Sequence, residues 1–317
     1  MFALHNMNYS VKIYARIGEL IQGILPDRSS FLVSGFPSRT LYSEAILEDG
    51  SDNPAGLTAS PEPAAAPASA LPDKARQALS LFLQSYSERD KIQRATDDTA
   101  TPMAPLAGKS IRLHSNIPPG KGLSSSSADV LSVLYVANDY LQAGFTPEEI
   151  YRIAARVEPT DPCLSQDIVL FKQQTGVTDR SISLPPLTLL FFDAAPDRKV
   201  ETLDLQRAYT AGAPGFFDEL LRRFLRSAEN KDHEGLMDCI TQSAIYNQSI
   251  LPLPRFDDYH QLAGRTGAGL MVAHSGTIIG LLTRPEQAAT LHEQLEGLAN
   301  HYQSTPVYIE NYFSTLP

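Results

Sequence analysis

The unit at residues 109–141 restricts the fold of this chain more than any other part of its 317-residue sequence. Lys109–Ser115 alternates apolar and polar residues, which predicts a half-buried strand. A loop rich in Pro, Gly and Ser follows directly, and Ala128–Leu141 is apolar on most sides, as a buried helix is. The sequence therefore predicts a strand that leads through a glycine-containing loop to the N-terminus of a buried helix.

The loop Pro118–Ser127 has the composition of an anion-binding turn. Two prolines stiffen its entry, two glycines free its backbone, and four serines lead into the helix. Backbone N–H groups at the positive end of a helix stabilise a phosphate. A Walker A loop is excluded, because Ser115 stands five residues before Gly120 and Gly122 follows Lys121. Composition alone favours an ordinary linker between a strand and a helix over a phosphate-binding loop.

The remaining pattern is that of an α+β protein. We expect strands at Tyr9–Tyr14, Ser30–Val33, Thr40–Leu47, Leu187–Phe192, Gly269–Ala273, Thr277–Leu282 and Val307–Phe313. We expect helices at Asp73–Tyr86, from a capping box at Thr146 to Glu158, and at Pro214–Ser227, Glu234–Ser249, Phe256–Ala263 and Pro285–His301. The Ala/Pro-rich segment 49–72 is predicted to be a flexible surface insertion, and two domains are expected at 1–180 and 181–317.

Composition narrows the classes of partner. Acidic residues number 36 against 26 basic ones, which disfavours a nucleic-acid-binding surface, including an RNA-binding role. No stretch reaches the roughly 18 apolar residues of a membrane span, and the N-terminus lacks a basic segment leading into an apolar run. The two cysteines, Cys163 and Cys239, have no metal or redox spacing. We expect a soluble cytoplasmic protein without nucleic-acid or membrane partners.

The loop resembles the second motif of the GHMP kinases, Pro-x-x-x-Gly-Leu-x-Ser-Ser-Ala. Pro118, Gly122, Leu123, Ser125 and Ser126 are in register, and a serine at position 127 replaces the motif's alanine. This superfamily includes galactokinase, homoserine kinase, mevalonate kinase and phosphomevalonate kinase. The resemblance implies an ATP- and Mg²⁺-dependent kinase with a ribosomal S5 domain 2-like N-terminal domain and a ferredoxin-like C-terminal domain.

Two further segments resemble the other landmarks of the superfamily. Ala15–Gly23 contains the Gly-Glu-Leu-Ile-Gln-Gly form seen in the L-threonine kinases of cobalamin biosynthesis, and Ala273–Leu282 resembles their third motif. Val157–Asp161 is also similar to that subgroup. The Cys-Pro-x-x-Cys run that usually precedes Gly-Glu in these kinases is replaced by a shorter segment at 14–17. The implied substrate is L-threonine, with homoserine or another small alcohol as the alternative, and a catalytically silent regulator as a further one.

The resemblance assigns roles to individual residues. The implied phosphate-binding residues are Pro119, Gly120, Lys121, Gly122, Leu123, Ser124, Ser125 and Ser126. The implied substrate-binding residues are Glu19, Gln22, Gly23, Ser275, Gly276 and Thr277. Gly18 and Gly23 flank the first of these segments, which predicts a flexible loop whose Glu19 and Gln22 bind the ammonium and carboxylate of an amino acid.

Metal binding and proton transfer are assigned to one serine and to acidic residues. Ser126 and Glu158 are the implied Mg²⁺ ligands, and Asp161 is the implied catalytic base, with Asp167 as the alternative. The Lys121 side chain either reaches a phosphate or is solvated, and His274 is expected to be structural. The expected partner is a small hydroxylated molecule, an amino acid in first place, and homodimer formation stays open.

Overall fold

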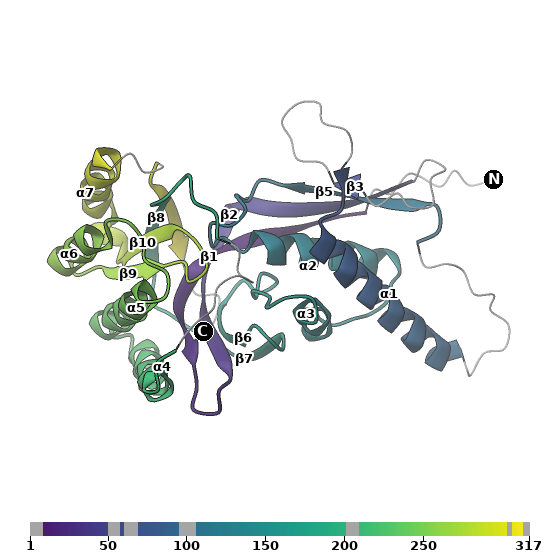
Figure 1. The fold of residues 1–317 in the computed structure, drawn as a ribbon, viewed down its shortest axis with the longest axis horizontal. Helices are drawn as coiled ribbons and strands as arrows, with labels where there is room; N and C mark the ends of the chain where they lie inside the picture. The colour runs from purple at the N-terminus through teal and green to yellow at the C-terminus, as the bar shows by residue number, and fades with distance from the viewer. Residues whose placement is uncertain are drawn as a thin grey trace.

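The computed structural model describes residues 9–49, 58–59, 69–94, 106–200, 209–302 and 306–312. It contains two β-sheets, one built from residues 9–182 and the other from residues 187–312. The first sheet lies beside helices α1, α2 and α3, and the second beside helices α4 to α7 (Figure 1). The expected α+β class is confirmed.

The first sheet is organised around the long strand β2 (Ser30–Asp49). Strand β1 (Tyr9–Ile24) pairs with β2 along most of its length. β5 (Lys109–Ser115) pairs with the C-terminal half of β2, and β6 (Ile168–Lys172) pairs near its N-terminal end, followed by β7 (Val177–Ile182). The predicted strand at 109–115 is thus confirmed, with Ile111 and Leu113 buried on the core face.

Three helices belong to this first half: α1 (Asp73–Arg94), α2 (Ser125–Tyr140) and α3 (Pro147–Ala155). The apolar segment predicted to be a buried helix is α2, whose Val130, Leu131, Val133 and Leu134 are almost inaccessible. Helix α3 begins with the predicted capping box, in which the Thr146 hydroxyl accepts from the Glu149 N–H and the Glu149 carboxylate accepts from the Thr146 N–H.

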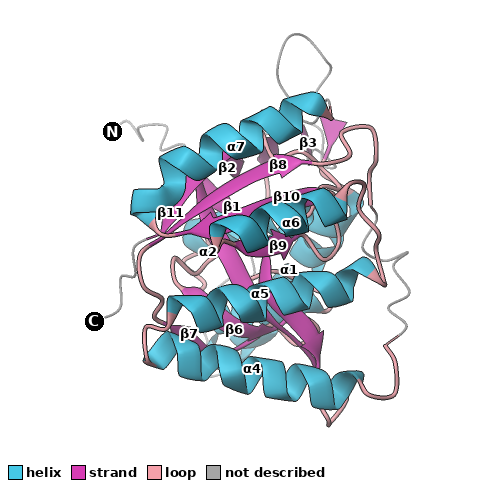
Figure 2. Cartoon of the chain, turned by 90° about the vertical axis from the view of Figure 1, so that its left-hand side faces the viewer, coloured by secondary structure: helices cyan, strands magenta, loops and turns pink. Residues whose placement is uncertain are grey.

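The second sheet has the strand order β11-β8-β10-β9, with all neighbours antiparallel. Its strands are β8 (Leu187–Asp193), β9 (Gly269–Val272), β10 (Ile278–Thr283) and β11 (Tyr308–Tyr312). Helices α5 (His233–Gln248), α6 (Phe256–Thr266) and α7 (Ala288–His301) lie over one side of these strands, and α4 (Ala213–Glu229) packs against α5 and β1 (Figure 2). A short 3₁₀ turn η2 (Pro285–Gln287) precedes α7. Strand β8 is buried along its whole length, in agreement with the nearly continuous apolar run at Leu187–Phe192.

The segment Gly18–Gly23 is not the loop expected from its sequence: it continues β1, with a register shift between Glu19 and Ile21. Within the segment 49–72, β3 (Thr58–Ala59) and β4 (Ser69–Ala70) extend the first sheet beyond β5. Residues 50–57 and 60–68 lie outside the described residues.

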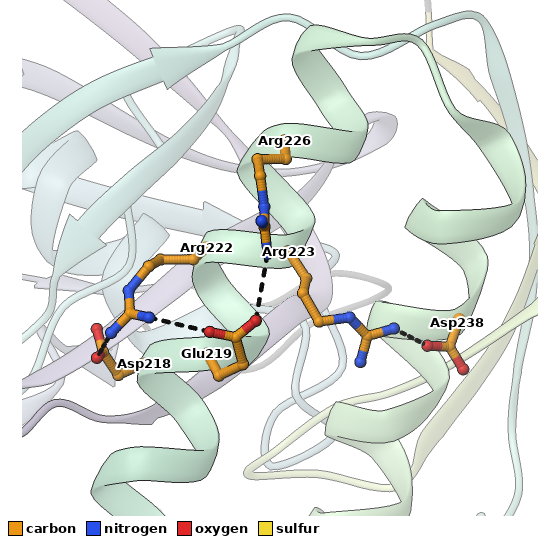
Figure 3. A network of polar contacts seen from close by, with 6 residues as sticks. All are labelled: Asp218, Glu219, Arg222, Arg223, Arg226 and Asp238. Carbon is orange, nitrogen blue, oxygen red and sulfur yellow. Dashed lines mark hydrogen bonds and ion pairs between the residues drawn. The ribbon is translucent and has the colours of Figure 1, made fainter.

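The outer surface of α4 carries a network of ion pairs (Figure 3). Arg222 binds Asp218 and Glu219 on the same helix, Arg226 also reaches Glu219, and Arg223 crosses to Asp238 on α5. These side chains are largely solvent-exposed, so the network adds little to stability. None of the helices in the described part of the chain combines the length and apolarity needed to cross a membrane.

Candidate active site

The loop between β5 and α2 has the backbone geometry of an anion-binding turn. Gly120, Gly122 and Ser124 have φ angles of 72°, 81° and 58°, the left-handed region in which a serine is uncommon. Ser124 directly precedes α2 and its side chain makes no capping hydrogen bond to the helix. No acidic residue lies in the first turn of α2, so the positive end of this helix is open to a negative ligand.

A cavity of about 330 Å³ opens along this loop. Both halves of the chain contribute to its wall. β1 provides Glu19, the entry and first turn of α1 provide Pro72 and Lys74, and the turn between β9 and β10 provides Ser275. The remaining lining residues are Pro119, Gly120, Gly122, Leu123, Ser124, Ser125, Ser126, Ser127, Asp129, Glu158, Pro159, Asp161, Gln173 and Val200.

Ser126 and Glu158 meet inside the cavity. The Ser126 hydroxyl donates a hydrogen bond to Glu158 Oε1, while Glu158 Oε2 binds Lys74 Nζ at 2.5 Å. The Glu158 carboxylate is only 6% exposed, whereas the Lys74 side chain is 32% exposed. A hydroxyl and a carboxylate oxygen in contact are the hard ligands that Mg²⁺ prefers. The predicted pairing of these two residues is therefore geometrically feasible.

Asp161 is held from two sides. Gln173 Nε2 donates to Asp161 Oδ1 at 2.6 Å, and the Asp161 N–H donates to the Ser127 hydroxyl at 2.9 Å. Burial, with the nearby Glu19 carboxylate as the next cause, raises the pKa of Asp161 to about 6. A carboxylate with a raised pKa that faces a cavity is suited to accept a proton near neutral pH.

Glu19 is fixed by residues from the second half of the chain. Its Oε2 accepts the His274 N–H at 2.9 Å and lies 3.3 Å from His274 Nδ1. On the other side of the ring, His274 Nε2 lies 3.1 Å from the Ser243 hydroxyl of α5. His274 is almost completely buried, so the geometry agrees with the structural role expected for it.

Three backbone hydrogen bonds hold the phosphate loop against segments distant in sequence. The Gly18 N–H of β1 donates to the Gly122 carbonyl at 3.2 Å. The Thr277 N–H donates to the Lys121 carbonyl, and the Val200 N–H donates to the Gly120 carbonyl, both at 3.0 Å. The three segments with superfamily resemblance are therefore in direct contact around this loop.

The Lys121 side chain points away from the cavity. Its Nζ forms an ion pair with Asp193 at 2.7 Å and contacts the carbonyl oxygens of Ala195, Pro196 and Arg198. An ammonium group has three protons, and these contacts occupy them all. The expectation that this side chain either reaches a phosphate or is solvated is therefore corrected.

Several other predicted site residues do not line the cavity. Gln22 Nε2 donates to Gln173 Oε1 at 2.5 Å, so this side chain acts one contact behind Asp161. Gly23 packs so closely against the ring of Phe217 that a Cβ atom at this position would lie 2.3 Å from the ring. The expected direct contact of these two residues with substrate is not supported by their positions.

Of the predicted substrate-binding residues at 275–277, one lines the cavity and two do not. Ser275 lines the cavity, whereas Gly276 is pressed against the backbone of the phosphate loop and Thr277 is completely buried. The backbone carbonyl of Asp167 accepts from Arg16 Nη2 at 2.8 Å, and Asp167 is absent from the cavity wall. Asp161 is thus the better placed of the two candidate bases.

Sequence reasoning missed three residues of the cavity. Lys74 is the one basic side chain among its described lining residues, and Asp129 is a carboxyl whose pKa burial raises to about 6. Gln173 links Gln22 with Asp161. The sequence did contain an indication of a role for Lys74. A cation in the first turn of a helix is unfavourable with respect to the helix dipole, so a functional role can account for its presence there.

Parts of this chain are similar to known proteins in sequence and in structure. Residues 87–171, which include the loop, Glu158 and Asp161, match the family described as GHMP kinases N terminal domain. A solved homoserine kinase from Cytophaga hutchinsonii is similar over 98% of this chain and 97% of its own, with a TM-score of 0.63 and 18% identity. The chain therefore has the fold of this solved kinase, and its residues 87–171 are similar to the N-terminal domain of the GHMP kinases.

Two further proteins are similar to this chain. An L-threonine kinase from Citrobacter freundii is 28% identical over 178 residues, which are 54% of this chain and 61% of that relative. The chain thus spans less than two thirds of that relative's length. A solved complex containing MVAPP, AMPPCP and magnesium is similar with a TM-score of 0.64 and 15% identity, over 97% of this chain and 100% of the other.

Proposed function

We propose that this chain is an ATP-dependent kinase that phosphorylates the side-chain hydroxyl of an amino acid, L-threonine in first place, giving O-phospho-L-threonine. One observation carries the proposal: a single cavity brings the phosphate loop together with the Ser126–Glu158 pair and Asp161. We assign residues 1–180 to a nucleotide-binding domain and 181–317 to a second domain whose Ser275 completes the cavity.

The residues of the loop fit a nucleotide and its metal ion. The backbone at 120–126 provides N–H groups at the positive end of α2, and Ser126 with Glu158 provides two hard oxygen ligands. Magnesium, when bound, neutralises charge on the phosphates. Lys74 binds Glu158, so its ammonium group also lies where it can offset the negative charge of the phosphates.

Asp161 supplies the base in this proposal. Its carboxylate takes the proton from the substrate hydroxyl, whose oxygen forms a bond to the γ-phosphorus of ATP. The bond from that phosphorus to the bridging oxygen breaks, and ADP leaves with the electron pair. Gln173 holds the carboxylate and Ser127 holds the backbone N–H of Asp161, so little reorientation is needed when substrate binds.

An amino acid fits this cavity better than a neutral alcohol. Glu19, Asp129, Glu158 and Asp161 give it four carboxyl groups, and Glu19 is held by His274 at the side where Ser275 enters. We assign Glu19 to the ammonium group of the substrate. A buried carboxylate gains more from a charged donor than from a neutral one.

A substrate panel tests the proposed function. L-threonine, L-homoserine and (R)-3-hydroxybutyrate are compared with ATP and Mg²⁺, and ADP and phosphorylated products are measured. The last compound has the hydroxyl and carbon chain of threonine without the ammonium group. L-threonine should give the highest kcat/KM. The value for (R)-3-hydroxybutyrate should be lower by a factor of about 100 or more. Preference for L-homoserine would reassign the substrate, and no product from any compound would remove the kinase function.

Replacing Lys74 by glutamine should raise the KM for ATP about tenfold, after allowance for the partial exposure of this side chain. The change removes the one cation among the described lining residues and leaves Glu158 with the Ser126 hydroxyl alone. Steady-state kinetics at saturating threonine measure the effect. Lys91→Gln on the exposed side of the same helix is the matched control and should leave KM unchanged. Equal KM values for the two variants would contradict the role of Lys74.

The pH dependence of kcat/KM should show an acidic limb with a midpoint near the raised pKa of Asp161, about 6. The base works only when deprotonated, so activity should rise with pH through this value and then level off. The ratio kcat/KM reports the free enzyme, in which this pKa applies. A pH profile measured in buffers of constant ionic strength checks the expectation, and a midpoint at the ordinary value near 4 would contradict it.

A further inference from the structure

A second cavity, of about 440 Å³, lies between the two sheets and is distinct from the candidate active site. Its wall is formed by β2, by the phosphate loop, and by β8, β10 and β11 of the second sheet. Leu123 is the one residue that lines both cavities within the described part of the chain. This second space, which we call the interdomain cavity, therefore shares a wall with the nucleotide site.

The wall of the interdomain cavity is mainly apolar. Its apolar residues are Leu41, Pro118, Leu123, Phe191, Ile278, Tyr308 and Ile309. The rings of Phe191 and Tyr308 are stacked, with centroids 5.4 Å apart and planes inclined by 27°. Tyr308 and Ile309 are 53% and 49% exposed, so the wall presents apolar surface to solvent beside the cavity. A pocket of this volume and composition is typical of sites for small organic ligands.

The charged groups of the wall indicate the charge of the ligand. Lys121 and Asp193 form an ion pair with each other. Glu310 Oε1 accepts the Ser38 hydroxyl at 3.0 Å and the Arg39 N–H at 3.1 Å. The Arg39 guanidinium is exposed, and the contact described for it is a neutral one, to the Asn311 carbonyl at 3.3 Å. Arg39 is thus the charge best able to bind a ligand.

We propose that the interdomain cavity binds an aromatic organic anion. Its rings lie against the apolar wall beside Phe191 and Tyr308, and its anionic group binds the Arg39 guanidinium at the rim. The ligand is separate from ATP and from the phosphorylated substrate. The binding site exists whether or not the chain is a threonine kinase.

The shared wall couples this ligand to the phosphate loop. Leu123 follows Gly122 in the loop, and the Lys121 side chain that lines the interdomain cavity belongs to a residue whose carbonyl accepts from Thr277. A ligand that presses on these two side chains alters the loop in which nucleotide phosphates bind. We expect the occupied cavity to change the affinity for nucleotide about fivefold or more, in the usual range of such coupling.

The experiment uses the fluorescent aromatic anion 8-anilinonaphthalene-1-sulfonate, titrated into the full chain with and without saturating AMPPCP and Mg²⁺. Three variants are compared with wild type. Arg39→Gln removes the rim charge, Thr40→Trp fills the mouth from another exposed lining residue, and Arg222→Gln removes an arginine charge on the distant surface of α4. Far-UV circular dichroism and thermal unfolding verify that each variant is folded.

The proposal predicts one saturable site that persists in the presence of AMPPCP. Arg39→Gln should weaken probe binding about tenfold and Thr40→Trp should abolish it, while Arg222→Gln should match wild type. The apparent affinity for AMPPCP should shift at least about fivefold when the probe is bound. Two results together would overturn the site: AMPPCP displaces the probe, and the Arg39 and Thr40 variants bind the probe as wild type does. The probe would then be bound in the nucleotide cavity. An unchanged AMPPCP affinity would overturn the coupling.

Discussion

Replacement of Asp161 by asparagine is expected to lower kcat by about 10²- to 10⁴-fold, the usual contribution of a positioned general base. Asparagine keeps the shape of the side chain and can still accept the 2.6 Å hydrogen bond from Gln173, but it cannot take a proton from the substrate. The KM for ATP should change little, since the phosphate loop is untouched. Steady-state kinetics with threonine and ATP, together with AMPPCP binding, separate the two effects.

The same variant should be at least as stable as wild type at pH 7. Burial raises the folded-state pKa of Asp161 to about 6, so the folded protein binds this proton more tightly than the unfolded chain does. Asp161 therefore lowers the free energy of unfolding progressively as the pH rises from about 4 to about 6. An uncharged asparagine removes that penalty, and urea denaturation at pH 7 measures the difference.

Asp167→Asn is the matched control for this prediction. Asp167 lies on the same segment, is absent from the cavity wall, and holds Arg16 through its backbone carbonyl, which the substitution leaves in place. Its kcat should stay within about threefold of wild type. Turnover near wild type in Asp161→Asn, with loss in Asp167→Asn, would show that the assignment of the base is reversed.

Replacement of Gly276 by alanine is expected to destabilise the fold by about 2–4 kcal/mol and to weaken nucleotide binding. A Cβ atom at this position would lie 2.0 Å from the Lys121 carbonyl oxygen and 2.3 Å from the Gly122 nitrogen. Both are backbone atoms of the phosphate loop, so neither can rotate away. The loop and the third-motif segment must separate, and the hydrogen bond from the Thr277 N–H to Lys121 is lost with them.

Gly264→Ala separates this close contact from the general effect of losing a glycine. Gly264 lies in α6, and a Cβ atom there would have no neighbour within 4 Å. Alanine is the better helix former, so this variant should be equal to wild type or more stable by up to about 1 kcal/mol. Urea denaturation and AMPPCP titration of both variants test the contact. Equal stability of Gly276→Ala and wild type would show that the loop does not depend on it.

The elements with strong local signals were predictable from the sequence. The capping box at Thr146, the buried helix after the phosphate loop and the nearly continuous apolar run of β8 each have a pattern that one segment determines alone. The meeting of Ser126 with Glu158 was also anticipated, although it rested on a family resemblance. Spacing in sequence does not by itself bring residues 32 positions apart into contact.

The features that sequence reasoning missed depend on tertiary partners. Lys121 has the character of a phosphate-binding residue in its loop, but Asp193 and three carbonyl groups of the following segment attract its ammonium group elsewhere. The Gly18–Gly23 segment resembles a loop, yet pairing with β2 keeps it in a strand. Lys74 enters the site only because the first turn of α1 is packed beside Glu158.

The most direct test of the central claim is the identity of the product. The chain is incubated with ATP, Mg²⁺ and L-threonine, and ³¹P NMR and mass spectrometry follow the phosphorus that leaves ATP. The proposed function predicts O-phospho-L-threonine formed in equal amount with ADP, and its absence with Asp161→Asn over the same time. ADP accompanied by inorganic phosphate alone, or ATP that stays intact while threonine is present, would contradict it.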